Sequence, residues 1–370
     1  MREPSQPIYR QILNELREAI LHGKYTSGER LPSEADLVGR FSTSRLTVQR
    51  ALKELQHEGL IERRAGSGTY VRELDQTTRY VFGLLIPGLG ETEIFEPICQ
   101  GIARATAAAG HSLLWGDTTQ VAGNKEQQTK DLCDYYLSRK VSGLFFAPLE
   151  LSPAKDDVNH RVVEALERAH IPVVLLDRGI YQYPRRSKYD LVGIDNRRAG
   201  FLVTEHLLRH GCVKLVFLAA PNSASTVDSR IQGFQDAVDA FAIPGGAKRI
   251  HIGSADDTEG IRAMLGRLAP DGIVCANDIT AARLMQTLER LDVKVPQQIR
   301  IIGIDDVRYG SLLAVPLTTL HQPCRELGEV AVATMLQRIA APDLPTRDIL
   351  LDCKLVIRRS CGTHAEVRQS

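Results

Sequence analysis

The sequence lacks several features that mark common protein classes. It has no apolar run near the roughly 18 residues of a membrane span, and its first residues, MREPSQPIYRQIL, lack the apolar core of a signal peptide. Its seven cysteines are odd in number and none forms a C-x-x-C pair, which indicates reduced, mostly buried thiols. We therefore expect a cytoplasmic protein without a membrane partner.

Catalytic signatures are also missing. The sequence contains no G-x-S-x-G elbow, no H-E-x-x-H helix and no phosphate-binding P-loop. Gly88-Leu89-Gly90 lacks the third glycine of a dinucleotide loop and indicates a turn. Asp305-Asp306 has no further clustered ligands beside it in the sequence. We expect no enzyme, no metal and no cofactor.

The 370 residues are 43% hydrophobic, enough to fill the cores of two or three domains. The net charge of +1 hides a small asymmetry. Residues 1–72 carry 12 Lys or Arg against 9 Asp or Glu, whereas the remainder carries 34 against 36. This basic surplus is too small to identify a nucleic-acid partner by itself.

Residues 7–72 show the pattern of three helices followed by a hairpin. Apolar residues at three- and four-residue spacing predict a helix over 7–22, and Ser33 with Asp36 predicts the capped start of a second. A third helix is expected from 42–44 to before Gly59, burying Leu46, Val48, Ala51, Leu52 and Leu55. Two β-prone pieces around residues 65–68, Ala-Gly-Ser-Gly, predict a hairpin, and the whole predicts a winged helix-turn-helix.

The third helix leaves Arg45 and Gln49 four residues apart on one exposed stripe. Charge on a helix exterior is also typical of a solvated face, but the order of three helices and a basic, glycine-tipped ribbon favours DNA binding. Arg can donate two hydrogen bonds to guanine, Gln can pair with adenine, and short hydroxyls can reach phosphates. The predicted DNA-binding residues are Ser33, Glu34, Ser44, Arg45, Thr47, Gln49, Arg50, Arg64, Gly66, Ser67 and Gly68.

This segment resembles the DNA-binding domain of the GntR family of bacterial repressors. That family is marked by L-P-S-E, S-R-x-T-V, A-L-x-x-L-x-x-E-G and a G-S-G-T-Y/F-V wing. The matching stretches here are residues 31–34, 44–48, 51–59 (which ends in Glu58-Gly59) and 66–71. Gln49 stands where many members have Arg, so the resemblance does not supply the operator sequence.

Beyond a polar stretch over 73–79, which we interpret as a linker, apolar strands alternate with helical stretches. Helices such as 97–109 and 198–209 separate expected strands at 81–86, 112–115, 143–147, 173–177, 191–194, 214–219, 273–275 and 299–304. Repeated βαβ units predict parallel sheets with helices on both faces, and polar residues after the strands then gather in a ligand crevice.

Three strand ends carry paired polar residues: Asp177-Arg178, Asn277-Asp278 and Asp305-Asp306. Carboxylates accept hydrogen bonds from sugar hydroxyls, while Arg and Asn can bridge two neighbouring oxygens. A carboxylate after a strand is as often a helix cap, and for Asp278 both interpretations stay open.

From Tyr80 to about Arg359 the chain resembles the effector domain of the LacI/GalR repressors, which is similar to periplasmic sugar-binding proteins. The matching stretches are DSRIQGF (228–234), CAND (275–278), GIDD (303–306) and PLTTLHQP (316–323). The resemblance implies two lobes joined by crossing strands, a ligand between them and dimerisation through this domain. It implies effector contacts from Phe95, Glu96, Asp177, Arg178, Arg230, Asn277, Asp305 and Gln322. Trp115, the single tryptophan, is expected in the core or at the rim instead.

The sequence thus predicts an α/β chain: a winged helix-turn-helix over 1–72, a linker over 73–79, a two-lobed parallel domain of the type I periplasmic-binding-protein kind over 80–360, and a tail over 361–370. We expect a homodimeric transcriptional repressor that binds double-stranded operator DNA and a small-molecule effector, with a sugar favoured. The alternatives are a purine or nucleoside effector, and a sugar- or nucleotide-processing enzyme with an accessory DNA-binding domain.

Overall fold

The computed structural model describes residues 8–21, 24–26, 28–57, 60–64, 67–71, 79–89, 93–116, 125–181, 184–246 and 249–363. The chain divides into two compact units, Met1–Tyr80 with Thr106–Ser112, and Val81–Ala105 with Leu113–Ser370. The predictions for Glu58, Gly59, Gly66, the linker up to residue 78 and the tail beyond residue 363 lie outside the described residues.

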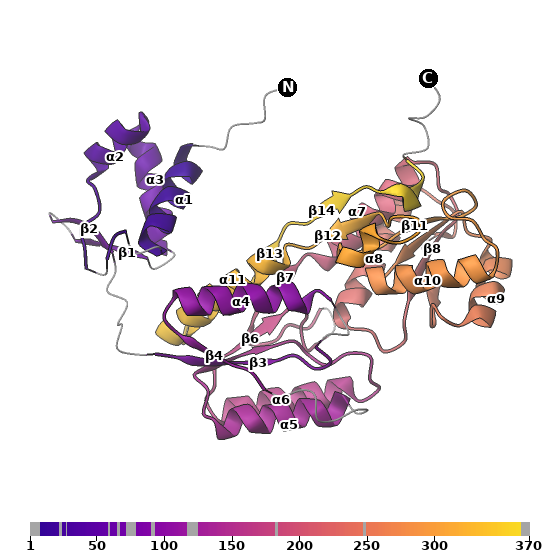
Figure 1. Cartoon of the computed structure of the whole chain (residues 1–370), viewed down its shortest axis with the longest axis horizontal. Coiled ribbons are helices and arrows are strands. Elements are labelled where there is room, and N and C mark those ends of the chain that lie inside the picture. The colour runs from indigo at the N-terminus through magenta and orange to yellow at the C-terminus, as the bar shows by residue number, and fades with distance from the viewer. Residues whose placement is uncertain are drawn as a thin grey trace. The chain divides into compact units, whose positions relative to one another are not determined.

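The first unit contains a winged helix-turn-helix (Figure 1). Helices α1 (Ile8–Leu21), α2 (Glu34–Phe41) and α3 (Arg45–His57) precede the antiparallel strands β1 (Ile61–Arg64) and β2 (Gly68–Val71). Their apolar faces form one core of Ile12, Leu16, Leu31, Leu37, Val48, Ala51, Leu52, Leu55, Ile61 and Val71. The predicted helices and hairpin are confirmed to within a few residues at their ends.

The prediction that Leu46 is buried is wrong. Its side chain is 78% exposed, whereas Val48, Ala51, Leu52 and Leu55 are fully buried. With about 100° of rotation per residue, Leu46 points to the side of α3 opposite that buried stripe. Leu46 is therefore exposed because of its position on the helix, although its side chain is apolar.

The second unit consists of two α/β lobes (Figure 1). The sheet of the first lobe has the order β13-β7-β6-β5-β3-β4, formed by β3 (Val81–Leu85), β4 (Ser112–Leu114), β5 (Gly143–Phe146), β6 (Val173–Leu176), β7 (Asp190–Ile194) and β13 (Asp348–Leu351). Helices α5 (Lys125–Ser138) and α6 (Lys155–Arg168) cover one face, and α4 (Phe95–Ala108) and α11 (Cys324–Ala340) cover the other.

The sheet of the second lobe has the order β11-β10-β8-β9. Its strands are β8 (Leu215–Ala219), β9 (Ile250–Ile252), β10 (Gly272–Cys275) and β11 (Arg300–Ile302). Helices α9 (Thr258–Leu268) and α10 (Asp278–Arg290) contribute to the core on one face, and α7 (Asn196–Arg209) and α8 (Ser225–Ala240) pack on the other. The strands of this sheet pair in parallel, as the βαβ repeats predict.

Short strands connect the lobes. β12 (Thr319–His321) pairs antiparallel with β14 (Lys354–Val356), and the chain crosses between lobes after β7, after β12 and between β13 and β14. The crossing strands that the resemblance implies are therefore confirmed, but we did not predict the positions of β9, β12, β13 and β14. β13 and β14 mix exposed and half-buried residues and have no apolar run for a sequence pattern to detect.

Helices α7 and α8 lie close together because each presents a glycine to the other. A Cβ on Gly233 would lie 1.8 Å from the carbonyl oxygen of Arg197, and one on Gly200 would lie 2.1 Å from that of Arg230. Neither site has room for a methyl group, and the opposing atoms are backbone. This packing fixes the part of α8 that carries the Arg230 side chain.

Gly233→Ala is expected to lower the free energy of unfolding by about 2–3 kcal/mol through overpacking. Gly266→Ala in α9 is the matched control, because a Cβ there meets nothing within 4 Å; it should raise the stability by about 0.5–1 kcal/mol. Urea unfolding followed by the fluorescence of Trp115 measures both. Equal effects of the two substitutions would contradict the close helix contact.

Candidate functional sites

Glu34, the first residue of α2, holds the polar side chains of the predicted DNA-reading surface together. One carboxylate oxygen accepts hydrogen bonds from Arg45 Nε at 2.8 Å and Gln49 Nε2 at 3.1 Å, and the other pairs with Arg63. The hydrogen bond from Arg45 is the main cause that lowers the pKa of Glu34. The Glu34 side chain is 15% exposed and that of Arg45 is 76% exposed, so a shielded carboxylate orients the exposed Arg45 and the half-buried Gln49.

Ser33 and Ser44 lie at the starts of the two helices of the helix-turn-helix. Ser33 Oγ accepts from the Asp36 amide at 3.2 Å, and Asp36 Oδ2 accepts from the Ser33 amide at 2.9 Å, which confirms the predicted cap. Ser44 Oγ accepts from the Thr47 amide at 3.2 Å, and the hydroxyls of Ser44 and Thr47 lie 2.8 Å apart. Both hydroxyls lie at the N-terminus of α3, where a phosphate binds favourably.

Two further predicted contacts stack on tyrosines. The guanidinium of Arg50 lies 4.1 Å from the ring centroid of Tyr9, and that of Arg64 lies 4.7 Å from the ring centroid of Tyr70. Arg64 also pairs with Glu62, with 2.7 Å between Nε and Oε1. Both arginines thus already have partners within the unit, which limits their conformations before any DNA binds.

Small residues of the hairpin, Ser67 and Gly68, make close contacts in the wing. Ser67 Oγ lies 2.7 Å from the Tyr70 hydroxyl. Gly68 has a φ of +132°, and a Cβ there would lie 2.7 Å from Arg30 Nε. Only glycine fits this position, whereas Gly66 lies outside the described residues.

Five buried polar side chains gather between the lobes of the second unit. Asp177 and Arg178 follow β6, Arg230 lies on α8, Asp305 follows β11, and Gln322 follows β12. Each is at most 8% exposed. All five are among the predicted effector contacts, and we call them, with Glu150 below, the charged cluster.

Arg230 is fixed mainly by its own lobe. Its Nε donates to Asn196 Oδ1 at 2.8 Å and its Nη1 to the Ala276 carbonyl at 2.6 Å. Its Nη2 lies 3.8 Å from Asp305 Oδ1, which also accepts a hydrogen bond from Gln322 Nε2 at 2.7 Å. The cluster is therefore preorganised on this side.

Glu150 is the member of the charged cluster that the sequence did not predict. Its carboxylate pairs with Arg178 and accepts a hydrogen bond from the Ala224 amide at the start of α8, in the other lobe. Arg178 Nε in turn lies 3.6 Å from Asp177 Oδ2. The available signal was a carboxylate three residues beyond the predicted strand over 143–147, whereas Asp177, Arg178 and Asp305 lie at the end of a predicted strand or within one residue of it.

Several buried atoms of the charged cluster make no hydrogen bond. Among the described residues, Asp177 Oδ1, Gln322 Oε1 and Arg178 Nε accept or donate no hydrogen bond. Because buried polar atoms are normally hydrogen-bonded, these atoms indicate a place for a polar ligand. Two acceptors and one donor match hydroxyl groups, which can both donate and accept.

Burial and the neighbouring guanidinium groups have opposite effects on the pKa of each carboxyl group in the cluster. Burial raises the pKa of Asp177 and Asp305, although Arg178 and Arg230 oppose the shift. Desolvation also acts on Glu150, but there the Arg178 guanidinium prevails and the pKa is lowered. Three carboxyl groups thus face two guanidinium groups that already have acidic partners.

The remaining predicted effector contacts differ in their positions. Phe95 is 2% exposed, and the Arg178 guanidinium lies 5.1 Å from its ring centroid, so it borders the charged cluster. Glu96 is exposed on α4, where it accepts from Gln100 at 3.3 Å. The structure therefore does not bring Glu96 into the buried cluster.

The open question about Asp278 is answered by its neighbour. Asn277 is the cap of α10, accepting from the Thr280 amide at 3.0 Å, while the buried Asp278 accepts from the Thr319 hydroxyl at 2.6 Å. Asn277 is half-buried, and the contacts of its side chain among the described residues are made by the amide oxygen.

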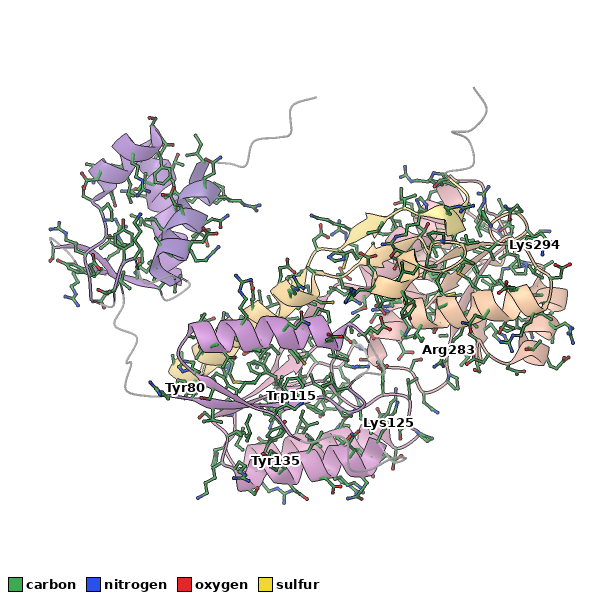
Figure 2. All side chains as sticks on the ribbon, in the orientation of Figure 1. Tyr80, Trp115, Lys125, Tyr135, Arg283 and Lys294 are labelled. Atoms are coloured by element: carbon green, nitrogen blue, oxygen red, sulfur yellow. The ribbon has the colours of Figure 1, made fainter. Side chains whose placement is uncertain are left out.

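Trp115 lies on the first lobe, 48% exposed, which excludes a core position (Figure 2).

The cysteines agree with the expectation of reduced, mostly buried thiols. All seven cysteines are free, and six are buried. Within the described ranges, no helix is long and apolar enough to cross a membrane, and no three His, Cys, Asp or Glu residues are grouped to hold a metal ion.

The raised pKa of Asp305 predicts a dependence of stability on pH. A carboxyl whose folded-state pKa lies above its ordinary value of 3.8 keeps its proton to a higher pH in the native state than in the unfolded chain, so between the two pKa values the native state binds more protons. The free energy of unfolding of the ligand-free protein should therefore fall as pH rises above about 4. Thermal unfolding between pH 5 and 8.5 should show a shallower fall for Asp305→Asn; identical slopes would contradict the shift.

Comparison with known proteins agrees with this geometry. Residues 8–71 match the sequence profile of the bacterial regulatory proteins of the gntR family, and residues 204–361 match that of a periplasmic binding protein-like domain. The chain is a DNA-binding transcriptional regulator with a GntR-type winged helix and a periplasmic-binding-protein-like domain, not an enzyme.

One relative matches nearly the whole chain, and solved structures share its fold. The chain is 27% identical to the arabinose metabolism transcriptional repressor of Geobacillus stearothermophilus, over 97% of this chain and 99% of the relative. A LacI family transcriptional regulator from Enterococcus faecium, solved with bound ribose, is 25% identical, with a TM-score of 0.61 over 76% of this chain and 98% of that one. The transcriptional regulator CelR in complex with cellobiose shares the fold, with 19% identity and a TM-score of 0.65 over 97% of this chain and 100% of that one.

Proposed function

We propose that this regulator is a homodimeric repressor that binds a partly palindromic operator and whose affinity for that operator is controlled by an uncharged sugar. The observation that carries the proposal is the charged cluster, in which the buried atoms Asp177 Oδ1, Gln322 Oε1 and Arg178 Nε make no hydrogen bond with any described residue. Operator binding would place the protein in the cytoplasm, as the sequence predicts.

The charges of the cluster favour a neutral ligand. Arg178 pairs with Glu150, and Arg230 lies beside Asp305. A phosphate or carboxylate would need a cation that is free to pair, or it would be buried uncompensated at a large cost. Hydroxyl groups satisfy carboxylates and guanidiniums alike and add no charge.

The cluster also supplies a route from ligand to lobe position. Its members come from both lobes, and the hydrogen bond from the Ala224 amide to Glu150 already links them. A sugar bound to Asp177 and Asp305 would favour one relative position of the lobes. It changes operator affinity only by the difference in its affinity for the two dimer geometries.

Two relatives support a sugar. The arabinose metabolism repressor spans nearly the whole chain, and the Enterococcus faecium regulator holds ribose in a domain of the same fold. A pentose is therefore the first ligand to test, with purines and nucleosides as the alternative effectors.

A thermal-shift panel tests the ligand class. Pentoses and hexoses are compared with their phosphates, with sugar acids and with purine nucleosides; a ligand at 100 times its Kd should stabilise the fold by about 2.7 kcal/mol. We expect a shift from a neutral sugar only, and its loss in Asp305→Ala. Asp256→Ala, an exposed carboxylate of the same lobe, is the matched control. A shift from a sugar phosphate or a nucleoside alone would refute the proposed ligand.

Operator binding is tested with Arg45→Ala. If Arg45 donates to a guanine, its loss should weaken binding by about 1–3 kcal/mol and relax the preference for that base pair. Arg40→Ala is the control, because this arginine at the end of α2 is also exposed but pairs with Glu15 of α1. Fluorescence anisotropy with the selected operator measures both; unchanged affinity of Arg45→Ala would remove it from the reading residues.

A further inference from the structure

We propose that Leu46 reads a thymine through the C5 methyl group of the base. This inference rests on the proposed binding to operator DNA. Leu46 is 78% exposed, and a large apolar side chain in water on the predicted reading helix is unexplained by the folding of the unit. Apolar contact with the thymine methyl is the part of the major-groove code that an aliphatic side chain can recognise.

The position of Leu46 on α3 supports this assignment. The buried stripe of the helix is formed by Val48, Ala51, Leu52 and Leu55, and Leu46 points away from its centre. Gln49, Arg50 and Lys53 follow Leu46 at three, four and seven residues, so they share its side of the helix.

The polar residues around Leu46 favour DNA over a protein as the partner that contacts this side chain. Arg45 precedes Leu46 and is 76% exposed at its side chain. A lone leucine among Arg, Gln and Lys side chains does not form the contiguous apolar patch of a protein interface. Cationic and amide groups around one apolar side chain do match a major groove, in which methyl groups lie beside hydrogen-bonding base edges and phosphates.

Leu46 also lies beside predicted DNA contacts along the chain. It stands between Arg45 and Thr47, two of the predicted DNA-binding residues. An outward-facing apolar residue between such neighbours is suited to contact a base rather than a phosphate. We therefore assign Leu46 to specificity and expect no contribution from it to phosphate binding.

The experiment replaces thymine by deoxyuridine, which removes the methyl group and keeps base pairing. The probe is a duplex selected by the full-length protein from a random-sequence pool, with each thymine substituted in turn. We expect the wild type to bind about fourfold more weakly per substituted half-site at one or two positions, the effect of about one buried methyl group. Leu46→Ala should bind the thymine and uracil duplexes equally at those positions.

Two controls separate this contact from general effects. Arg45→Ala should bind more weakly but keep the thymine-to-uracil ratio, and Leu312→Ala, an exposed leucine of the second unit at 82%, should keep it too. The slope of log Kd against log salt should be unchanged in Leu46→Ala, because no phosphate contact is lost.

The outcomes distinguish this inference from the proposed function. Tight operator binding with no uracil effect at any position, or an equal uracil effect in wild type and Leu46→Ala, would overturn the role of Leu46 and leave operator binding intact. Failure to enrich any sequence from the pool would overturn operator binding itself.

Discussion

The burial of charge between the two lobes is the constraint on which the effector domain depends. Arg178 and Arg230 are each about 95% removed from solvent, and an isolated buried charge would cost several kcal/mol. Each guanidinium must therefore lie against a carboxylate, and the structure brings Glu150, Asp177 and Asp305 from different segments to provide one. The lobes contribute members of both signs, so their relative position and the pairing of these charges are linked.

The packing of the second lobe serves this arrangement. Gly200 and Gly233 let α7 approach α8, and the close approach allows Asn196 at the start of α7 to accept from Arg230 on α8. A guanidinium held by its own lobe can meet a ligand without first losing conformational freedom. The winged helix uses the same principle at Glu34, where one shielded carboxylate orients Arg45 and Gln49.

The sequence predicts most of this architecture because both domains follow strong local patterns. The helix periodicity and the glycine-tipped ribbon locate the winged helix, and residues that directly follow apolar strands identify Asp177, Arg178 and Asp305. Features that depend on tertiary structure are not predicted by these local patterns. Glu150 reaches the cluster through a loop, and β12 and β14 exist because they pair with each other. Leu46 was misassigned because an apolar residue in an amphipathic helix is ordinarily buried.

The most direct test of the central claim is whether sugar binding and operator binding are coupled. Because linkage is reciprocal, the factor by which saturating sugar changes the Kd for operator equals the factor by which saturating operator changes the Kd for sugar. We predict that this common factor differs from one for the wild type, by about 5- to 150-fold as is typical of coupled sites, measured by anisotropy and calorimetry at one salt concentration. A sugar that binds the charged cluster with the same affinity in the free and the operator-bound protein would contradict the account.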